Sequence, residues 1–166
     1  GTSYVNYTAH GSNTSWADPS FTISQINALG NQGKYPLVVG NCCLTNKFDI
    51  TTCFGEAWLR ARDRGAIGYI GGSNSTYWDE DLWWGNGNYP IVHPNSQGLP
   101  PNKENTGMGA YDAVFTGGFV SNAAMILAGN LAVEESSTSR KKYYWEVYHL
   151  MGDPSLMLYW GMPKKM

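Results

Sequence analysis

The chain has 166 residues, 42% of them hydrophobic, and a formal net charge of −2 at neutral pH, which fits one domain with a substantial core. The absence of a strong positive charge or a long basic run argues against nucleic acid as a partner. No apolar run approaches the roughly 18 residues that predict a transmembrane helix.

The N-terminal part of the chain predicts a strand followed by a helix. Residues 3–12 (SYVNYTAHGS) predict a short strand that runs into a loop at His10. Residues 17–33 predict a helix, with Asp18 as its cap and Pro19 at its first position.

Two apolar runs then flank a second predicted helix. Residues 34–41 (KYPLVVGN) and 65–72 (GAIGYIGG) are apolar without alternation, which is typical of strands covered on both faces. Residues 53–65 between them predict a helix that ends at a glycine. This order of strands and helices predicts an α/β domain with a mostly parallel central sheet flanked by helices.

The second half of the chain is less regular. Residues 72–107 are rich in Asn, Gly, Pro and Trp, and a loop of this length in a compact domain is usually functional. Residues 118–135 and 139–152 predict helices, and residues 154–160 predict a last strand.

The predicted strands bring reactive side chains to one place. They end at His10, at Cys42 and Cys43, and at Gly71 and Gly72. The carboxyl ends of parallel strands meet at one edge of a sheet, so the histidine and the cysteine pair are expected to be neighbours. Because successive side chains of a strand point to opposite faces, one cysteine is expected to be buried and the other to face His10.

Three interpretations of this group are open from the pattern alone. A thiol beside a histidine can act as a nucleophile at neutral pH. Adjacent cysteines after an apolar strand also occur as buried packing. A zinc site from His10, Cys42, Cys43 and Cys53 is conceivable, although this spacing matches no common zinc motif.

Four segments resemble a known family over nearly the whole chain, including the spacing from histidine to cysteine. They are NYTAHGSNTSWADPS, VVGNCCLTNKFD, CFGEAWLRARDRGAIGYIGGSNSTYWDED and HLMGDPSLM. They resemble the gingipains, which are secreted bacterial cysteine endopeptidases with a caspase-like α/β fold, and they are more similar to the lysine-specific than to the arginine-specific type. The resemblance implies a three-layer sandwich and cleavage of proteins after a basic residue, with lysine preferred.

Carried over by position, the resemblance implies Cys43 as nucleophile and His10 as base, with Cys42 in a packing role. The backbone N–H groups of Gly11 and Cys43 would form the oxyanion hole. A glycine after the histidine lets the backbone approach the substrate carbonyl closely.

The stretch NSTYWDEDLWWGNGNY places three acids among aromatic residues. By itself it suggests a solvated acidic turn. The resemblance implies a specificity pocket in which Asp81 pairs with a substrate ammonium, lined also by Thr8 and Tyr77. In another register of the loop the role would fall to one of the neighbouring acids, Asp79 or Glu80.

The resemblance also implies that this chain is only part of a complete catalytic domain. Residues 1–166 correspond to one catalytic subdomain, while the family's first subdomain and the acid that orients the histidine lie upstream, outside this chain. A second chain could supply them; alternatively the chain is a non-catalytic module that binds a protein partner. The catalysis needs no cofactor, and the family's structural calcium is expected without assigned ligands. Secretion or attachment to the bacterial cell surface is expected.

Overall fold

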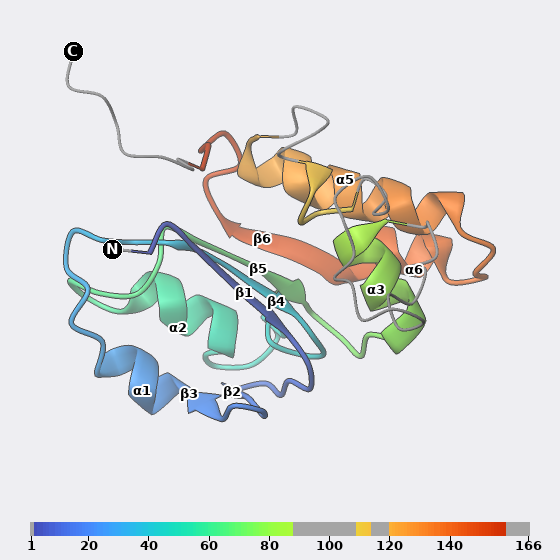
Figure 1. Cartoon of the computed structure of the whole chain (residues 1–166). Helices are drawn as coiled ribbons and strands as arrows, with labels where there is room; N and C mark the ends of the chain where they lie inside the picture. Colours follow the sequence, from blue (N-terminus) through green and yellow to red (C-terminus); the bar gives the residue numbers. More distant parts are fainter. Residues whose placement is uncertain (1, 88–108, 114–119, 159–166) are drawn as a thin grey trace, which may run out of the picture.

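A computed structural model describes residues 2–87, 109–113 and 120–158, and one four-stranded sheet forms its centre (Figure 1). Its strands, in the spatial order β1-β4-β5-β6, are β1 (Tyr4–Thr8), β4 (Leu37–Asn41), β5 (Gly68–Gly72) and β6 (Tyr148–Gly152). The first three run parallel, and β6 is antiparallel to β5. The predicted α/β fold with a mostly parallel sheet is confirmed.

Helices cover both faces of the sheet and give the expected three layers (Figure 1). One face carries α1 (Ile23–Asn27) and α2 (Phe54–Arg60), and the other carries α5 (Asn122–Glu135) and α6 (Lys141–Val147). A further helix, α3 (Trp78–Asn86), packs against α5 near the end of the sheet where the parallel strands finish.

Strand β4 explains the apolar run without alternation. Leu37 and Val39 belong to the core under α5 and α6, whereas Val38 belongs to the core under α1 and α2. All three side chains are fully buried, as expected of a strand covered on both faces. Because alternate residues belong to different cores, a one-residue slip of β4 would exchange the two sets.

The helix predicted for residues 17–33 is mostly wrong. Its start forms a turn and a small hairpin, and only α1 is helical. Asp18 and Pro19 lie in the turn, and Thr22 is the N-cap. Its hydroxyl oxygen accepts a hydrogen bond from the backbone N–H of Gln25, and its own backbone N–H donates to the Gln25 side-chain oxygen, which completes a capping box. The hairpin strands are β2 (Ser15–Trp16) and β3 (Phe21–Thr22).

The C-terminal elements also differ from the prediction. The helix predicted for 139–152 stops at Val147, and residues 148–152 form the strand β6. Two contacts favour the strand: the Tyr148 ring stacks on the Trp84 ring, with centroids 4.2 Å apart, and β6 pairs along β5. With that edge of β5 occupied, the described part of the predicted strand 154–160 makes only an isolated bridge. Within the predicted loop 72–107, α3 is helical and the residues from 88 on lie outside the described ranges.

A substitution at Gly40 would test how tightly β4 is packed. A Cβ atom there would lie 2.0 Å from the Tyr69 hydroxyl oxygen, whereas one at Gly30 would meet nothing within 4 Å. We expect Gly40→Ala to lower the free energy of unfolding by about 2 kcal/mol, because the core cannot accept the methyl group without strain. Urea denaturation measures it, with Gly30→Ala as the matched control; equal stability of the two variants would contradict this packing.

Candidate active site

The register of the sheet brings the histidine turn to the cysteine turn. β1 and β4 pair with a constant offset of 33 residues, from Tyr4 with Leu37 to Thr8 with Asn41. The same offset, continued beyond the strand ends, matches His10 with Cys43. The predicted proximity of the histidine and the cysteine pair is therefore confirmed.

Gly11 is the point at which the two turns touch. A Cβ atom on Gly11 would lie 2.7 Å from the Cys42 Sγ atom and 2.7 Å from the carbonyl oxygen of Cys43. Only glycine permits this approach of the two turns, whereas the predicted approach of Gly11 to a substrate carbonyl stays a prediction.

The two turns open on one small cavity at the carboxyl edge of the sheet. Its volume is about 70 Å³, and its lining residues are Ala9, His10, Cys43, Thr76, Trp78 and Asp81. The exposed His10 ring meets the Trp78 ring edge-on, with centroids 5.1 Å apart. Histidine, thiol and carboxylate thus share one cavity, and Trp78 forms part of its wall.

The two adjacent cysteines have different environments. Cys42 is buried, and burial raises the pKa of its thiol to about 12. Cys43 is half-buried and lines the cavity. The expected division into one packed and one accessible cysteine is confirmed, although both lie in the bend after β4 and not within the strand. Cys53 is buried at the start of α2.

Hydrogen bonds to residues at the end of β5 hold the cysteine turn in place. The backbone N–H groups of Leu44 and Asn46 donate to the carbonyl oxygens of Asn74 (3.1 Å) and Gly72 (2.9 Å), which follow or end β5. Leu44 has a φ of 64°, a left-handed conformation that is costly for a leucine. The turn that carries Cys43 is therefore held by its neighbours in a conformation it would not adopt alone.

Thr76, which sequence reasoning missed, holds the Cys43 sulfur. Its backbone N–H donates to Cys43 Sγ at 3.2 Å, and its hydroxyl oxygen lies 3.7 Å from the same sulfur. In the part of the chain that the structure describes, the backbone N–H groups of Gly11 and Cys43 donate no hydrogen bond. They are therefore available to an oxyanion.

Asp81 is a buried carboxylate held by neutral donors. It is 7% exposed; its Oδ2 accepts from the Thr76 hydroxyl at 2.6 Å, and its Oδ1 accepts from the hydroxyls of Tyr148 (2.7 Å) and Tyr144 (2.9 Å). Burial raises the pKa of Asp81, and the three hydrogen bonds oppose that shift. No described cation pairs with it.

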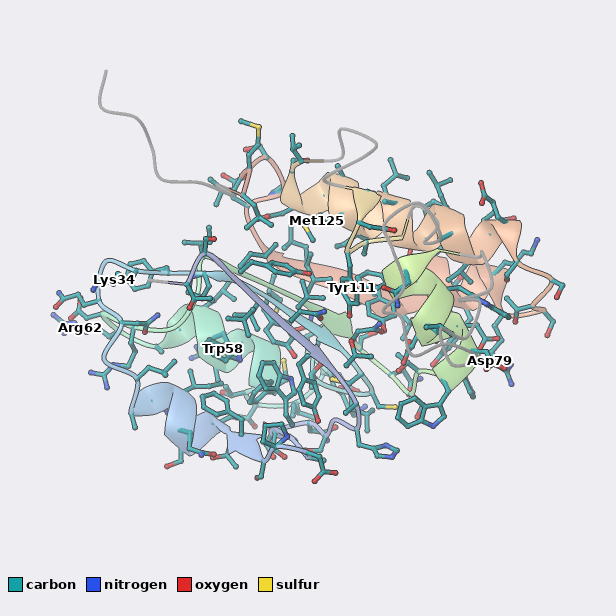
Figure 2. The ribbon with its side chains drawn as sticks, viewed as in Figure 1. Lys34, Trp58, Arg62, Asp79, Tyr111 and Met125 are labelled. Carbon is teal, nitrogen blue, oxygen red and sulfur yellow. The ribbon has the colours of Figure 1, made fainter. Side chains whose placement is uncertain are left out.

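The other two acids of the stretch do not reach the cavity. Glu80 is buried in an ion pair with Arg140 at 3.1 Å and bonds the Thr138 hydroxyl. Asp79 is exposed, and Figure 2 shows it at the end of the molecule away from Lys34 and Arg62. Instead of a solvated turn, the three acids occupy the first turn of α3, whose helix dipole favours negative charge.

Thr8 and Tyr77 do not line this cavity. The Thr8 hydroxyl is hydrogen-bonded to the Tyr111 hydroxyl at 2.7 Å. The Tyr77 ring is exposed and lies 4.0 Å from the Arg140 guanidinium carbon. Their contact with substrate stays a prediction.

Sequence reasoning also missed the two phenols on Asp81. Tyr144 and Tyr148 are four residues apart inside the segment predicted as one helix. That spacing would have placed them on one helix face. Nothing in the pattern indicated Asp81 as their partner 63 and 67 residues away.

No metal site is evident in the residues described. There, no three His, Cys, Asp or Glu side chains gather where they could hold a metal ion, so His10 and the three cysteines form no zinc group. The structural calcium implied by the resemblance stays a prediction. Among the described helices, none is long and apolar enough to cross a membrane.

A mostly parallel α/β sheet with a thiol and an imidazole on one cavity at its carboxyl edge is an arrangement suited to thiol hydrolases. The chain belongs to peptidase family C25, whose family model matches residues 1–159. The family membership implied by the resemblance is thereby confirmed.

Among known proteins, the chain is 45% identical over 172 residues to Lys-gingipain of Porphyromonas gingivalis, covering 99% of this chain and 10% of that protein. A solved protease structure matches with a TM-score of 0.86 and 45% identity, over 98% of this chain and 36% of that one. The Arg-specific cysteine proteinase gingipain R matches with a TM-score of 0.66 at 21% identity, over 94% of this chain and 33% of that one, which supports the fold alone. The chain thus spans a tenth of the Lys-gingipain it matches.

The environments of the three cysteines predict selective alkylation. We expect iodoacetamide at pH 8 to label Cys43 first, because Cys42 and Cys53 are buried and burial raises the pKa of both thiols. Timed peptide mass spectrometry measures the rates, and the urea-unfolded chain, in which all three should label alike, is the control. Labelling of Cys42 as fast as Cys43 in the folded chain would contradict the assigned burial.

Proposed function

We propose that this chain carries the nucleophile, the base and the specificity pocket of a cysteine endopeptidase that cleaves proteins after lysine. The single observation that carries the proposal is the shared cavity, in which Cys43 and His10 lie beside a buried carboxylate, Asp81, that has no described cation as partner. The thiol and imidazole supply the chemistry of peptide cleavage, and the carboxylate supplies a partner for a cationic side chain.

In the proposed reaction, His10 takes the proton of the Cys43 thiol while the sulfur attacks the substrate carbonyl carbon. The new oxyanion accepts hydrogen bonds from the N–H groups of Gly11 and Cys43, which have no other described acceptor. The C–N bond then breaks, and His10 gives its proton to the leaving amine. A thioester on Cys43 remains.

Water completes the cycle. His10 takes a proton from a water molecule as the water oxygen attacks the thioester carbonyl carbon. The C–S bond breaks, the carboxylic acid product leaves, and the thiol regains its proton from the imidazole. No cofactor is needed for these steps.

The pocket favours lysine for an electrostatic reason. Asp81 is buried without a described cation, so a substrate ammonium would restore charge balance in a cavity where water screens little. Trp78 offers an apolar wall for the alkyl stem of the substrate side chain. The name of the matched relative, Lys-gingipain, agrees with this preference.

The proposal includes a further contribution from outside this chain. The His10 imidazole makes no hydrogen bond to any described residue, and the chain covers 36% of the matched protease structure. We propose that the acid that orients His10 belongs to the family's first subdomain, supplied by another segment or a second chain. Location outside the cell or on its surface is proposed on the same likeness.

Replacing the nucleophile tests the proposal. Under conditions in which the unaltered chain cleaves lysine-containing peptides, we expect Cys43→Ala to abolish cleavage, because alanine offers no nucleophile. Cys42→Ala should retain cleavage and lower the free energy of unfolding by about 1 kcal/mol. Full activity of Cys43→Ala would refute the assignment. If instead the chain never cleaves and Cys43 reacts no faster than a simple thiol, the partner-binding module is the better interpretation.

Replacing the pocket acid tests the specificity. We expect Asp81→Asn to lower kcat/KM for cleavage after lysine by about 10² or more, because the buried countercharge is lost. The free energy of unfolding should hold or rise, since asparagine keeps the shape and removes a buried charge. Asp79→Asn, the same change on the exposed face of α3, is the matched control. An unchanged lysine preference in Asp81→Asn would remove Asp81 from the pocket.

The raised pKa of Asp81 sets a pH dependence. The free carboxyl takes up its proton at a higher pH than an ordinary aspartate, and the protonated form attracts no ammonium. In a Cys43→Ala background, which removes the thiol, affinity for n-butylammonium should therefore fall as pH falls through this raised pKa. An NMR titration at several pH values measures it, and the dependence should vanish in the Asp81→Asn double variant.

A further inference from the structure

The two oxygens of Asp81 differ in how many acceptor positions they have left. A carboxylate oxygen offers two lone-pair positions. Oδ1 is within hydrogen-bond distance of two phenol hydroxyls, those of Tyr144 and Tyr148, and among the described residues Oδ2 accepts only from Thr76. With respect to the described residues, one acceptor position is therefore free, and it lies on Oδ2, next to Thr76, a residue that lines the cavity.

Each phenol hydroxyl lies within hydrogen-bond distance of Asp81 Oδ1 and of a second acceptor, and charge favours donation to the carboxylate. The Tyr148 hydroxyl also lies against the Asn41 side-chain oxygen, and the Tyr144 hydroxyl lies 3.1 Å from the carbonyl oxygen of Tyr77. Each hydroxyl has one proton, and an ionised carboxylate is a stronger acceptor than an amide oxygen. Asp81 Oδ1 therefore accepts hydrogen bonds from both hydroxyls, and both of its acceptor positions are occupied.

We infer that Tyr144 and Tyr148 are specificity-determining residues, which make the pocket select an ammonium over a guanidinium by occupying Asp81 Oδ1. The inference rests on the proposed function. A guanidinium binds a carboxylate best as a fork, with two parallel N–H groups that need one free position on each oxygen. An ammonium is a point charge that needs one position, and Oδ2 provides it.

An arginine side chain is disfavoured because one of its guanidinium N–H groups would have no carboxylate oxygen to bind. With Oδ1 occupied, an entering guanidinium makes one bond to Oδ2 and leaves its second N–H without that partner in the small cavity. An unpaired buried donor is costly, whereas the ammonium can direct a second N–H to the Thr76 hydroxyl oxygen. The same saturation explains why a carboxylate pocket need not accept both basic side chains.

Removal of one phenol hydroxyl should open the second oxygen. In the chain with Cys43→Ala, we would measure affinities for n-butylammonium and n-propylguanidinium, which mimic the two side chains, by NMR titration. The chain should prefer butylammonium. Tyr144→Phe or Tyr148→Phe should lower the ratio of the two affinities about tenfold, the scale of discrimination by one such contact. A purely structural role would weaken both ligands alike and leave the ratio unchanged.

Tyr69→Phe is the matched control. It removes another buried hydroxyl, which accepts from the Trp16 indole on the opposite face of the sheet, and it should leave the ratio within about twofold. Tyr148 is part of the central sheet, so Tyr148→Phe could prevent folding. In that case Tyr144→Phe, on α6, is the variant that tests the inference.

The two possible failures are distinguishable. If Asp81→Asn binds butylammonium as well as the parent chain does, the proposed lysine pocket fails. If butylammonium binding needs Asp81 but both folded phenylalanine variants keep the parent ratio, the lysine pocket stands and the role of the two tyrosines is overturned.

Discussion

The parallel pairing of β1 with β4 is the constraint on which the site depends. Its offset sets His10 against Cys43, and the missing side chain of Gly11 lets the two turns touch. The register is fixed by packing, because Val38 and Val39 belong to cores on opposite faces of the sheet. A slip by one residue would invert both cores. The same burial that stabilises the domain therefore aligns the reactive groups.

The pocket acid is kept without a cationic partner although a cation is near. Arg140 forms an ion pair with Glu80, the residue before Asp81. The Asp81 carboxylate accepts hydrogen bonds from three neutral hydroxyls instead. Hydroxyl donors stabilise the carboxylate in part but do not neutralise it, so the folded chain keeps an unfavourable buried charge. In the proposed function, that unmet charge is the basis of cation recognition, and an internal cationic partner on Asp81 would occupy the pocket. The Glu80–Arg140 pair holds the turn that carries Asp81.

Periodicity and strand order are enough to predict the three parallel strands and the edge at which they end. The prediction is wrong where contacts between distant residues decide the structure, as in β6. The apolar run of β4 and the strand-end loops placed His10 and the cysteines together, because parallel strands finish at one edge. The capping box that begins α1 at Thr22 is visible in the sequence, whereas the predicted helix begins too early, at Asp18 and Pro19. Residues 148–152 could not be recognised as a strand, since pairing with β5 and stacking on Trp84 override their helical pattern. The Tyr148 hydroxyl on Asp81 comes from this misassigned strand, and the Tyr144 hydroxyl comes from α6 just before it.

Hydrogen bonds join the proposed pocket acid, Asp81, to the proposed nucleophile, Cys43. Thr76 donates through its backbone to Cys43 Sγ and through its hydroxyl to Asp81. Asn41, the last residue of β4, donates its amide to the Asp81 carbonyl oxygen at 2.8 Å and immediately precedes the cysteine pair. In the proposed complex, a substrate side chain bound to Asp81 is thus positioned relative to the sulfur by hydrogen bonds within the fold. Catalysis by orientation requires such rigidity between the recognised group and the attacked carbonyl, so under the proposed function recognition of the cation and placement of the peptide bond depend on the same sheet edge.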